Sequence, residues 1–248
     1  MSAKRAGAFG RGDLGFSLVV IFPLFLLYSV GILFTDRING VDFVTGALLN
    51  VVDRSRLAYL GLHVGLAVVY LAGVTYLARK RAFRFSRVPP LLLEAAIYAL
   101  TVGSLIVFVM HNLLGFEALV ATQPGIAASS AGTSGDLATR FVMSVGAGVW
   151  EELIFRLVLM GGGALVLMTL GLRRGLAVTI ALVVSSLAFS AVHHLGPLGD
   201  DFSLALFTYR ALAGAVFGAI FYFRSLGHAA YAHFFYDVYV LLLLPHTS

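Results

Sequence analysis

The hydrophobic positions of this chain fall in long blocks separated by short polar stretches. Seven of these blocks are each long enough for a helix that crosses a bilayer, which needs about 20 apolar residues. They cover residues 14–34, 57–77, 88–114, 137–172, 175–195, 202–223 and 226–245. The pattern predicts an all-α fold, a polytopic integral membrane helical bundle with about seven transmembrane helices.

The composition leads to the same class of protein. The chain has 248 residues, of which 60% are hydrophobic and only 12% charged, and a soluble domain with so few charges could not cover its surface. The absence of cysteine removes disulfides, thiolate nucleophiles and cysteine-ligated metals. The net charge of +5 comes largely from basic residues beside apolar spans, where the flanks of membrane helices are positive, so it does not favour nucleic-acid binding.

The basic residues also predict an orientation. Three turns are basic, at residues 78–87, at Arg173-Arg174 and at Arg224, and the positive-inside rule places them and the N-terminus in the cytoplasm. Seven crossings then leave the C-terminus outside. The block 137–172 would span ~50 Å as one helix, which is longer than the hydrocarbon core, so this helix protrudes, tilts or breaks. The glycine triplet 161–163 is the obvious place for a break, and a true turn there would give eight crossings as the alternative. We treat 1–248 as one membrane domain, with three spans in 14–114 and the charged motifs in 137–245.

Three charged residues lie inside the apolar run from 141 to 172. Charges at bilayer depth are costly and persist mainly where they pair or face a polar cavity. Glu152 and Arg156 are four residues apart, so they share a helical face and can pair, while Glu151 lies about 100° around the axis. This arrangement suggests a structural role for Glu152 and leaves Glu151 free to act.

Two further motifs can reach the same depth as Glu151. If Arg173-Arg174 is a hinge between antiparallel helices, Glu151 and His193 are separated from it by similar lengths of helix and can meet. His233 and Asp237 share a face of the last predicted helix. We therefore expect Glu, His, His and Asp from three helices near the middle of the bilayer, provided that the helix over 137–172 protrudes inward or bends.

Other interpretations of these polar residues remain open. Buried Glu-Arg pairs and histidines can serve only to lock helices together, and transporters place such groups in proton relays. Glu151, His193, His233 and Asp237 would also make a credible Zn²⁺ ligand set, although there is no HExxH motif.

Other polar residues carry less weight. Ser134 lies in a GTSG tetrapeptide that resembles the GxSG of rhomboid serine proteases, but outside any apolar span. The sequence does not decide whether Arg210 reaches the cavity. We expect secondary or interfacial positions for the remaining polar groups of the spans, which are His63, Glu94, His111, His194 and His228.

Taken in order, the three motifs resemble those of the CPBP family, which includes the Ras-converting CAAX prenyl proteases and bacteriocin-processing proteins. The segment 151–156 resembles EExxxR, 189–193 resembles FxxxH, and 233–237 resembles HxxxN/D. The resemblance covers about 137–241 and implies a glutamate-dependent intramembrane endopeptidase that acts on a membrane-associated protein or peptide without a cofactor. The alternative is a non-catalytic interaction or immunity protein, or a proton-coupled transporter, with the same polar cluster.

The resemblance also implies a role for each motif residue. Glu151 would be the general base, His193 would position the attacking water, and His233 with Asp237 would form the oxyanion site. Glu152, Arg156 and Phe189 would support them. Asp237 departs from the pattern, because many members have Asn there and a carboxylate can donate a hydrogen bond only when it is protonated.

Overall fold

A computed structural model describes residues 14–35, 38–52, 55–79, 83–116, 137–195 and 199–243, and all regular structure in these ranges is helical. The first half contains α1 (Leu14–Gly31), η1 (Ile32–Phe34), α2 (Phe43–Val51), α3 (Arg56–Arg79), η2 (Phe85–Arg87) and α4 (Val88–Asn112). The second half contains α6 (Leu137–Gly146), η4 (Ala147–Gly162), α7 (Gly163–Thr169), α8 (Arg174–Val192), α9 (Leu204–Phe223), α10 (Leu226–Val238) and η5 (Tyr239–Leu243). The predicted all-α class is confirmed.

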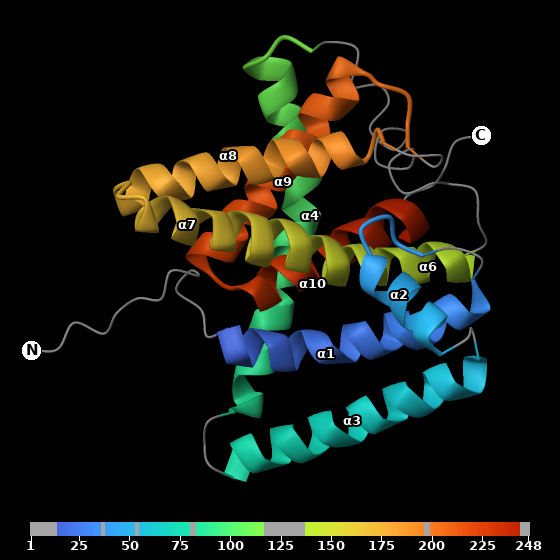
Figure 1. Ribbon diagram of the computed structural model, residues 1–248. Helices are drawn as coiled ribbons and strands as arrows, with labels where there is room; N and C mark the ends of the chain where they lie inside the picture. Colours follow the sequence, from blue (N-terminus) through green and yellow to red (C-terminus); the bar gives the residue numbers. More distant parts are fainter. Residues whose placement is uncertain are drawn as a thin grey trace, which may run out of the picture.

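The helix α10 occupies the middle of the bundle (Figure 1). It packs against α1, α4, α6, η4 and α9, while α3 lies at the edge against α1. Large apolar side chains on the outer helices are exposed, for example Val69 on α3 and Leu93 on α4. An apolar outer surface around a more polar centre is the arrangement that a lipid bilayer requires.

Six helical segments among the described residues are long and apolar enough to cross a membrane. They are Leu14–Phe34, Arg56–Tyr76, Phe85–Asn112, Leu137–Thr169, Arg174–Val192 and Leu204–Phe223. Each corresponds to one predicted block. The seventh block is helical as α10 and η5, but it is not among the six, because His228, His233 and Asp237 lower its hydropathy.

Of the three options for the long helix, the break at residues 161–163 is not formed. Gly162 and Gly163 have ordinary helical dihedrals, with φ of −62° and −59°, so α6, η4 and α7 form one continuous helix and the eighth crossing is not formed. Glycine permits a turn but does not require one. The chain turns at Gly171 instead, where φ is +93° and the amide of Leu172 donates to the carbonyl of Leu167 in a helix-ending turn.

The middle of this long helix is a π-helix of 16 residues, η4. The i to i+5 hydrogen bonds of a π-helix are uncommon and occur most often at functional sites. All three charges of the EExxxR motif lie in η4 and are buried.

Glycines allow the helices that carry the motifs to approach closely. Gly214 and Gly218 form a GxxxG pair on α9 and lie against Ser186 and Leu182 of α8. Gly148 of η4 lies against α10, where an added Cβ would come within 2.7 Å of the Ala230 carbonyl oxygen. This contact brings η4 next to the helix that carries His233.

We expect Gly148→Ala to destabilise the protein, because the new methyl group collides with the α10 backbone and overpacking typically costs about 1–3 kcal/mol. Gly162→Ala in the same element is the matched control, since nothing lies within 4 Å of an added Cβ there. The control should be neutral or slightly stabilising. Thermal unfolding of the two purified variants in detergent measures the difference, and equal unfolding midpoints would show that this helix contact is not tight.

Candidate active site

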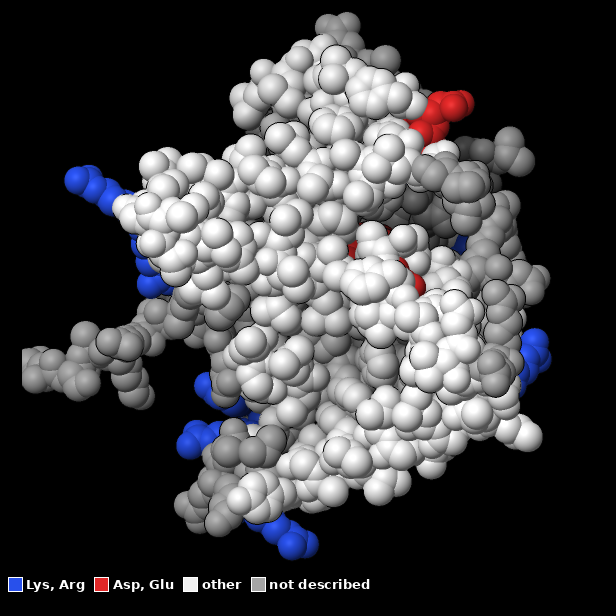
Figure 2. Space-filling view, in the orientation of Figure 1, with Lys and Arg blue, Asp and Glu red and all other residues white. Residues whose placement is uncertain are grey.

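A cavity of about 260 Å³ lies between η4, α8, α9 and α10, next to the connection that follows η1. Glu151, His193, His233 and Asp237 all line it. Figure 2 shows acidic atoms at the bottom of a hollow between uncharged side chains. The structure therefore brings the four predicted site residues together.

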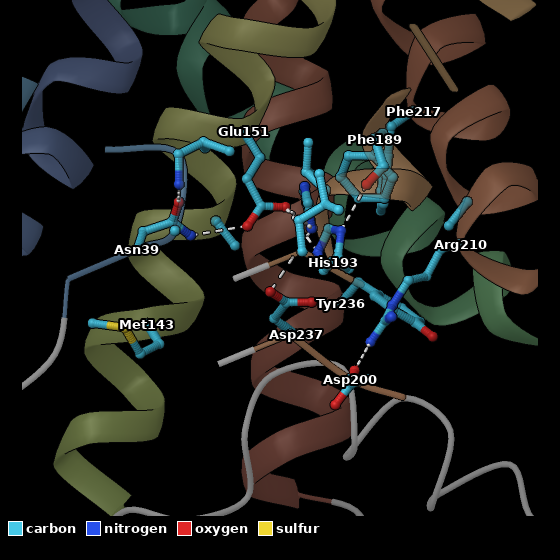
Figure 3. Close-up of a pocket in the computed structure, with 18 of the residues that line it drawn as sticks. Asn39, Met143, Glu151, Phe189, His193, Asp200, Arg210, Phe217, Tyr236 and Asp237 are labelled. Atoms are coloured by element: carbon cyan, nitrogen blue, oxygen red, sulfur yellow. Dashed lines mark hydrogen bonds and ion pairs between the residues drawn. The ribbon is translucent and has the colours of Figure 1, made fainter. Parts of the chain in front are cut away.

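The two oxygens of the Glu151 carboxylate have different surroundings (Figure 3). Oε1 accepts a 2.9 Å hydrogen bond from Nδ2 of Asn39. Oε2 faces Nε2 of His193 at 3.8 Å and Nε2 of His233 at 3.9 Å. Both distances are too long for hydrogen bonds, so one oxygen is held and the other faces two imidazoles across a short gap.

His193 is oriented by its own helix. It lies directly after the last residue of α8, and its Nδ1 is 2.7 Å from the carbonyl oxygen of Phe189. A carbonyl only accepts hydrogen bonds, so Nδ1 carries a proton, and when the ring is neutral the lone pair of Nε2 faces Glu151. The four-residue spacing of FxxxH thus has a physical basis in this structure.

His233 is held on one side by Glu152 and on the other by aromatic packing. Its Nδ1 is 2.7 Å from Oε1 of Glu152, and its ring stacks on Phe217 with centroids 4.5 Å apart. Its Nε2 points into the cavity and lies 3.8 Å from Oδ2 of Asp237. Since Nδ1 donates to a carboxylate, Nε2 carries a proton only when the ring is an imidazolium.

The predicted pairing of Glu152 with Arg156 is present. Nε of Arg156 lies 3.2 Å from Oε2 of Glu152, as an ion pair without an aligned hydrogen bond, and both side chains are at most 1% exposed. The guanidinium also lies 4.5 Å from the ring centroid of Phe189. Glu152 therefore joins Arg156 to His233, and Arg156 joins η4 to α8.

Two features of the site were missed from the sequence. Asn39 lies in a connection that we read only as polar, although Asn39-Gly40 is a common turn pair. Its Oδ1 accepts from the amide of Val41 at 3.1 Å, and this bond assigns Nδ2 to Glu151. The second feature is an ion pair between Arg210 and Asp200. Arg210, which the sequence left undecided, reaches the cavity: it is one of the lining residues and is 3% exposed.

The other polar groups lie away from the reacting region or outside the described residues. His63 is packed under Tyr59, whose carbonyl it contacts, and His194 contacts the carbonyl of Asp200. Glu94 pairs with Arg224 and lies near His228. Ser134, in the segment resembling GxSG, lies outside the described residues.

The metal arrangement left open by the sequence stays a hypothesis. In the described part of the chain, no three or more His, Cys, Asp or Glu groups are placed to hold a metal ion together. His233 contacts Glu152 through Nδ1, so Nε2 is the ring atom that faces the cavity.

Fold and site together define a polytopic helical membrane protein with a buried glutamate-histidine cluster. Residues 133–239 match the model of a family described as type II CAAX prenyl endopeptidase Rce1-like. The match confirms the resemblance to the CPBP family of intramembrane proteases over the part of the chain that carries the three motifs. No curated protein and no solved structure matches the chain.

We expect Glu152→Gln to lower stability strongly, because it leaves Arg156 buried without a countercharge, and breaking a buried pair costs about 3–5 kcal/mol. Glu94→Gln is the matched control. It breaks another Glu-Arg pair, but one with side chains 26% and 48% exposed, for which a loss of about 0–1 kcal/mol is typical. Unfolding in detergent would contradict the assignment if the two variants lost the same stability.

Proposed function

We propose that this protein is an intramembrane endopeptidase that hydrolyses a peptide bond of a membrane-associated substrate, with Glu151 as the general base. The observation that carries the proposal is the free Oε2 of Glu151, which faces Nε2 of both His193 and His233 inside an apolar bundle. The match to a protease family supports the reaction class. We also propose that the N-terminus is cytoplasmic, on the basis of the basic turns.

In this scheme Glu151 and His193 hold the attacking water. Both Oε2 and the unprotonated Nε2 accept hydrogen bonds, so one water can donate a hydrogen bond to each of them. The two atoms are 3.8 Å apart, and a water at hydrogen-bond distance of about 2.8 Å from both lies about 2 Å to the side of the line that joins them. The water oxygen is then left with its lone pairs free to attack a carbonyl carbon.

Glu151 can carry the proton that must move during the remaining steps of hydrolysis. As the water oxygen bonds to the carbonyl carbon, Glu151 takes one proton and the carbonyl oxygen becomes an oxyanion. The C–N bond then breaks and the proton on Glu151 passes to the leaving nitrogen. In a cavity with little water, a donor aimed at the oxyanion stabilises it strongly.

We assign the oxyanion donor to His233. As an imidazolium it donates through Nε2–H into the cavity while Nδ1–H remains bound to Glu152. Arg156 balances the charge of Glu152. The Glu152 carboxylate therefore orients the His233 ring and takes no proton during the reaction. Asp237 lies beside Nε2 and orients it when ionised, or donates to the oxyanion when protonated.

The test of the proposal is the loss of cleavage in Glu151→Gln. We expect this variant to fold, since the amide oxygen still accepts from Asn39, and to lose turnover, since it cannot take a proton. Substrates are found by comparing the membrane proteomes of cells with and without the gene, and cleavage is then scored in a deletion strain that carries each variant.

Glu94→Gln provides the control in that strain, because it makes the same chemical change away from the cavity. It should restore cleavage, whereas Glu151→Gln and His193→Ala should not. If Glu151→Gln and His193→Ala restored every phenotype of the deletion, the protein would act by interaction and not by catalysis.

Asp237→Asn tests the oxyanion site. If Asp237 takes the position that Asn has in many relatives, the variant should keep or increase its activity near neutral pH, because an amide donates without needing a proton. Peptide cleavage by the purified parent and variant across pH, with metal content measured in parallel, checks this outcome. Stoichiometric zinc together with an inactive Asp237→Asn protein would overturn the scheme, because replacing a carboxylate ligand with an amide weakens metal binding.

A further inference from the structure

The cavity lies toward one end of the bundle. Two of the connections between helices line it: residues 38–41 after η1, and Leu195, Gly199 and Asp200 in the connection from α8 to α9. Figure 1 shows the connections next to α2 and the end of α8 on the same side of the bundle, away from the turn between α7 and α8.

The length of α8 gives the distance to the opposite end. This helix has 19 residues, begins at Arg174 and is followed directly by His193. At about 1.5 Å per residue it is ~28 Å long, close to the ~30 Å thickness of the hydrocarbon core. The His193 end of the cavity is therefore separated from the Arg173-Arg174 turn by nearly the whole membrane.

The helix α1 leads to the same conclusion independently. Asn39 follows the first predicted span, Leu14–Phe34, and donates directly to Glu151. The start of that span lies by the basic connection after α3, where Phe16 stacks on Phe83 and Arg87 lies over Phe16. Glu151 therefore lies one side chain away from the connection that follows η1, at the end of α1 opposite to the basic connection.

The charges differ between these two ends. Among the described residues, the end away from the cavity carries a group of exposed arginines, one of which, Arg224, pairs with Glu94. Figure 2 shows basic side chains along the left edge of the molecule. These arginines are Arg79, Arg84, Arg87, Arg173, Arg174 and Arg224. Among the described residues outside the Glu-His cluster, the cavity end has Arg56, Arg140 and Arg210 together with Asp42, Asp200 and Asp201, so positive charge does not dominate there.

We infer that the active-site cavity opens to the extracytoplasmic side of the membrane, so that the substrate is a membrane-anchored peptide whose scissile bond lies at the outer boundary of the bilayer. The positive-inside rule places the arginine-rich end in the cytoplasm, and the cavity connections lie at the other end. The inference rests on the proposed function for its substrate class. The direction of the opening rests only on geometry and charge.

The chain is suited to a direct test because it contains no cysteine. Gly40 lines the cavity and Gly175 lies in the first turn of α8 beside the arginines. Both are exposed, and an added Cβ meets nothing within 4 Å at either position. Gly40→Cys and Gly175→Cys are therefore matched single-cysteine variants at the two ends.

We expect a membrane-impermeant maleimide to label Gly40→Cys to the same extent in intact and permeabilised cells, and to label Gly175→Cys only after permeabilisation. Asp201→Cys and Leu170→Cys form a second pair at exposed positions. Asp201→Cys should be labelled in intact cells, and Leu170→Cys only after permeabilisation. Labelling of Gly175→Cys or Leu170→Cys in intact cells, with Gly40→Cys and Asp201→Cys protected, would overturn the inference.

The labelling is repeated with Glu151→Gln in each variant, which separates this inference from the proposed function. An outward-facing pattern together with cleavage that survives Glu151→Gln would leave the direction standing and remove the mechanism. Cleavage that depends on Glu151 but occurs in cytoplasmic segments of the substrates would leave the protease and remove the outward opening. Cleavage sites confined to outer segments support both.

Discussion

The Glu152 carboxylate is the constraint on which the rest of the site depends. It is fully buried, and a lone charge there would be costly, so the bundle must deliver partners to it. Arg156 comes from the same helix and His233 from α10. Arg156 in turn contacts the ring of Phe189 and the carbonyl of Gly214, so one charge fixes η4 against α8, α9 and α10.

The position of Glu152 also restricts the direction of the neighbouring Glu151 side chain. Adjacent residues on a helix point in different directions, so once Glu152 faces Arg156 and His233, Glu151 must face elsewhere. It faces the cavity, where Asn39 holds one oxygen and the other remains free of direct hydrogen bonds. Two adjacent carboxylates thus take separate parts, one in packing and one available for chemistry.

Much of the fold and part of the site could be predicted from the sequence. Span lengths and hydropathy give the six crossing helices, and four-residue spacings give the Glu152-Arg156 pair and the link from Phe189 to His193, since these depend only on helical geometry. The glycine triplet left a turn open as an alternative, because glycine is compatible with both a turn and a helix. The Gly214-Gly218 pair carries a GxxxG signal that could have indicated the close approach of α8 and α9.

The contacts made by residues in the connections between helices could not be predicted from a sequence pattern. Asn39 and Asp200 reach their partners through segments without periodicity, so their positions depend on the finished bundle. Asn39 also lies outside the part that matches the protease family, residues 133–239, yet it holds the carboxylate at the centre of the cavity. Tyr28 of α1 accepts a hydrogen bond from the amide of Asn39 and fixes that connection in turn. The N-terminal part of the chain therefore does more than anchor the protein, because Asn39 holds one oxygen of the Glu151 carboxylate in place.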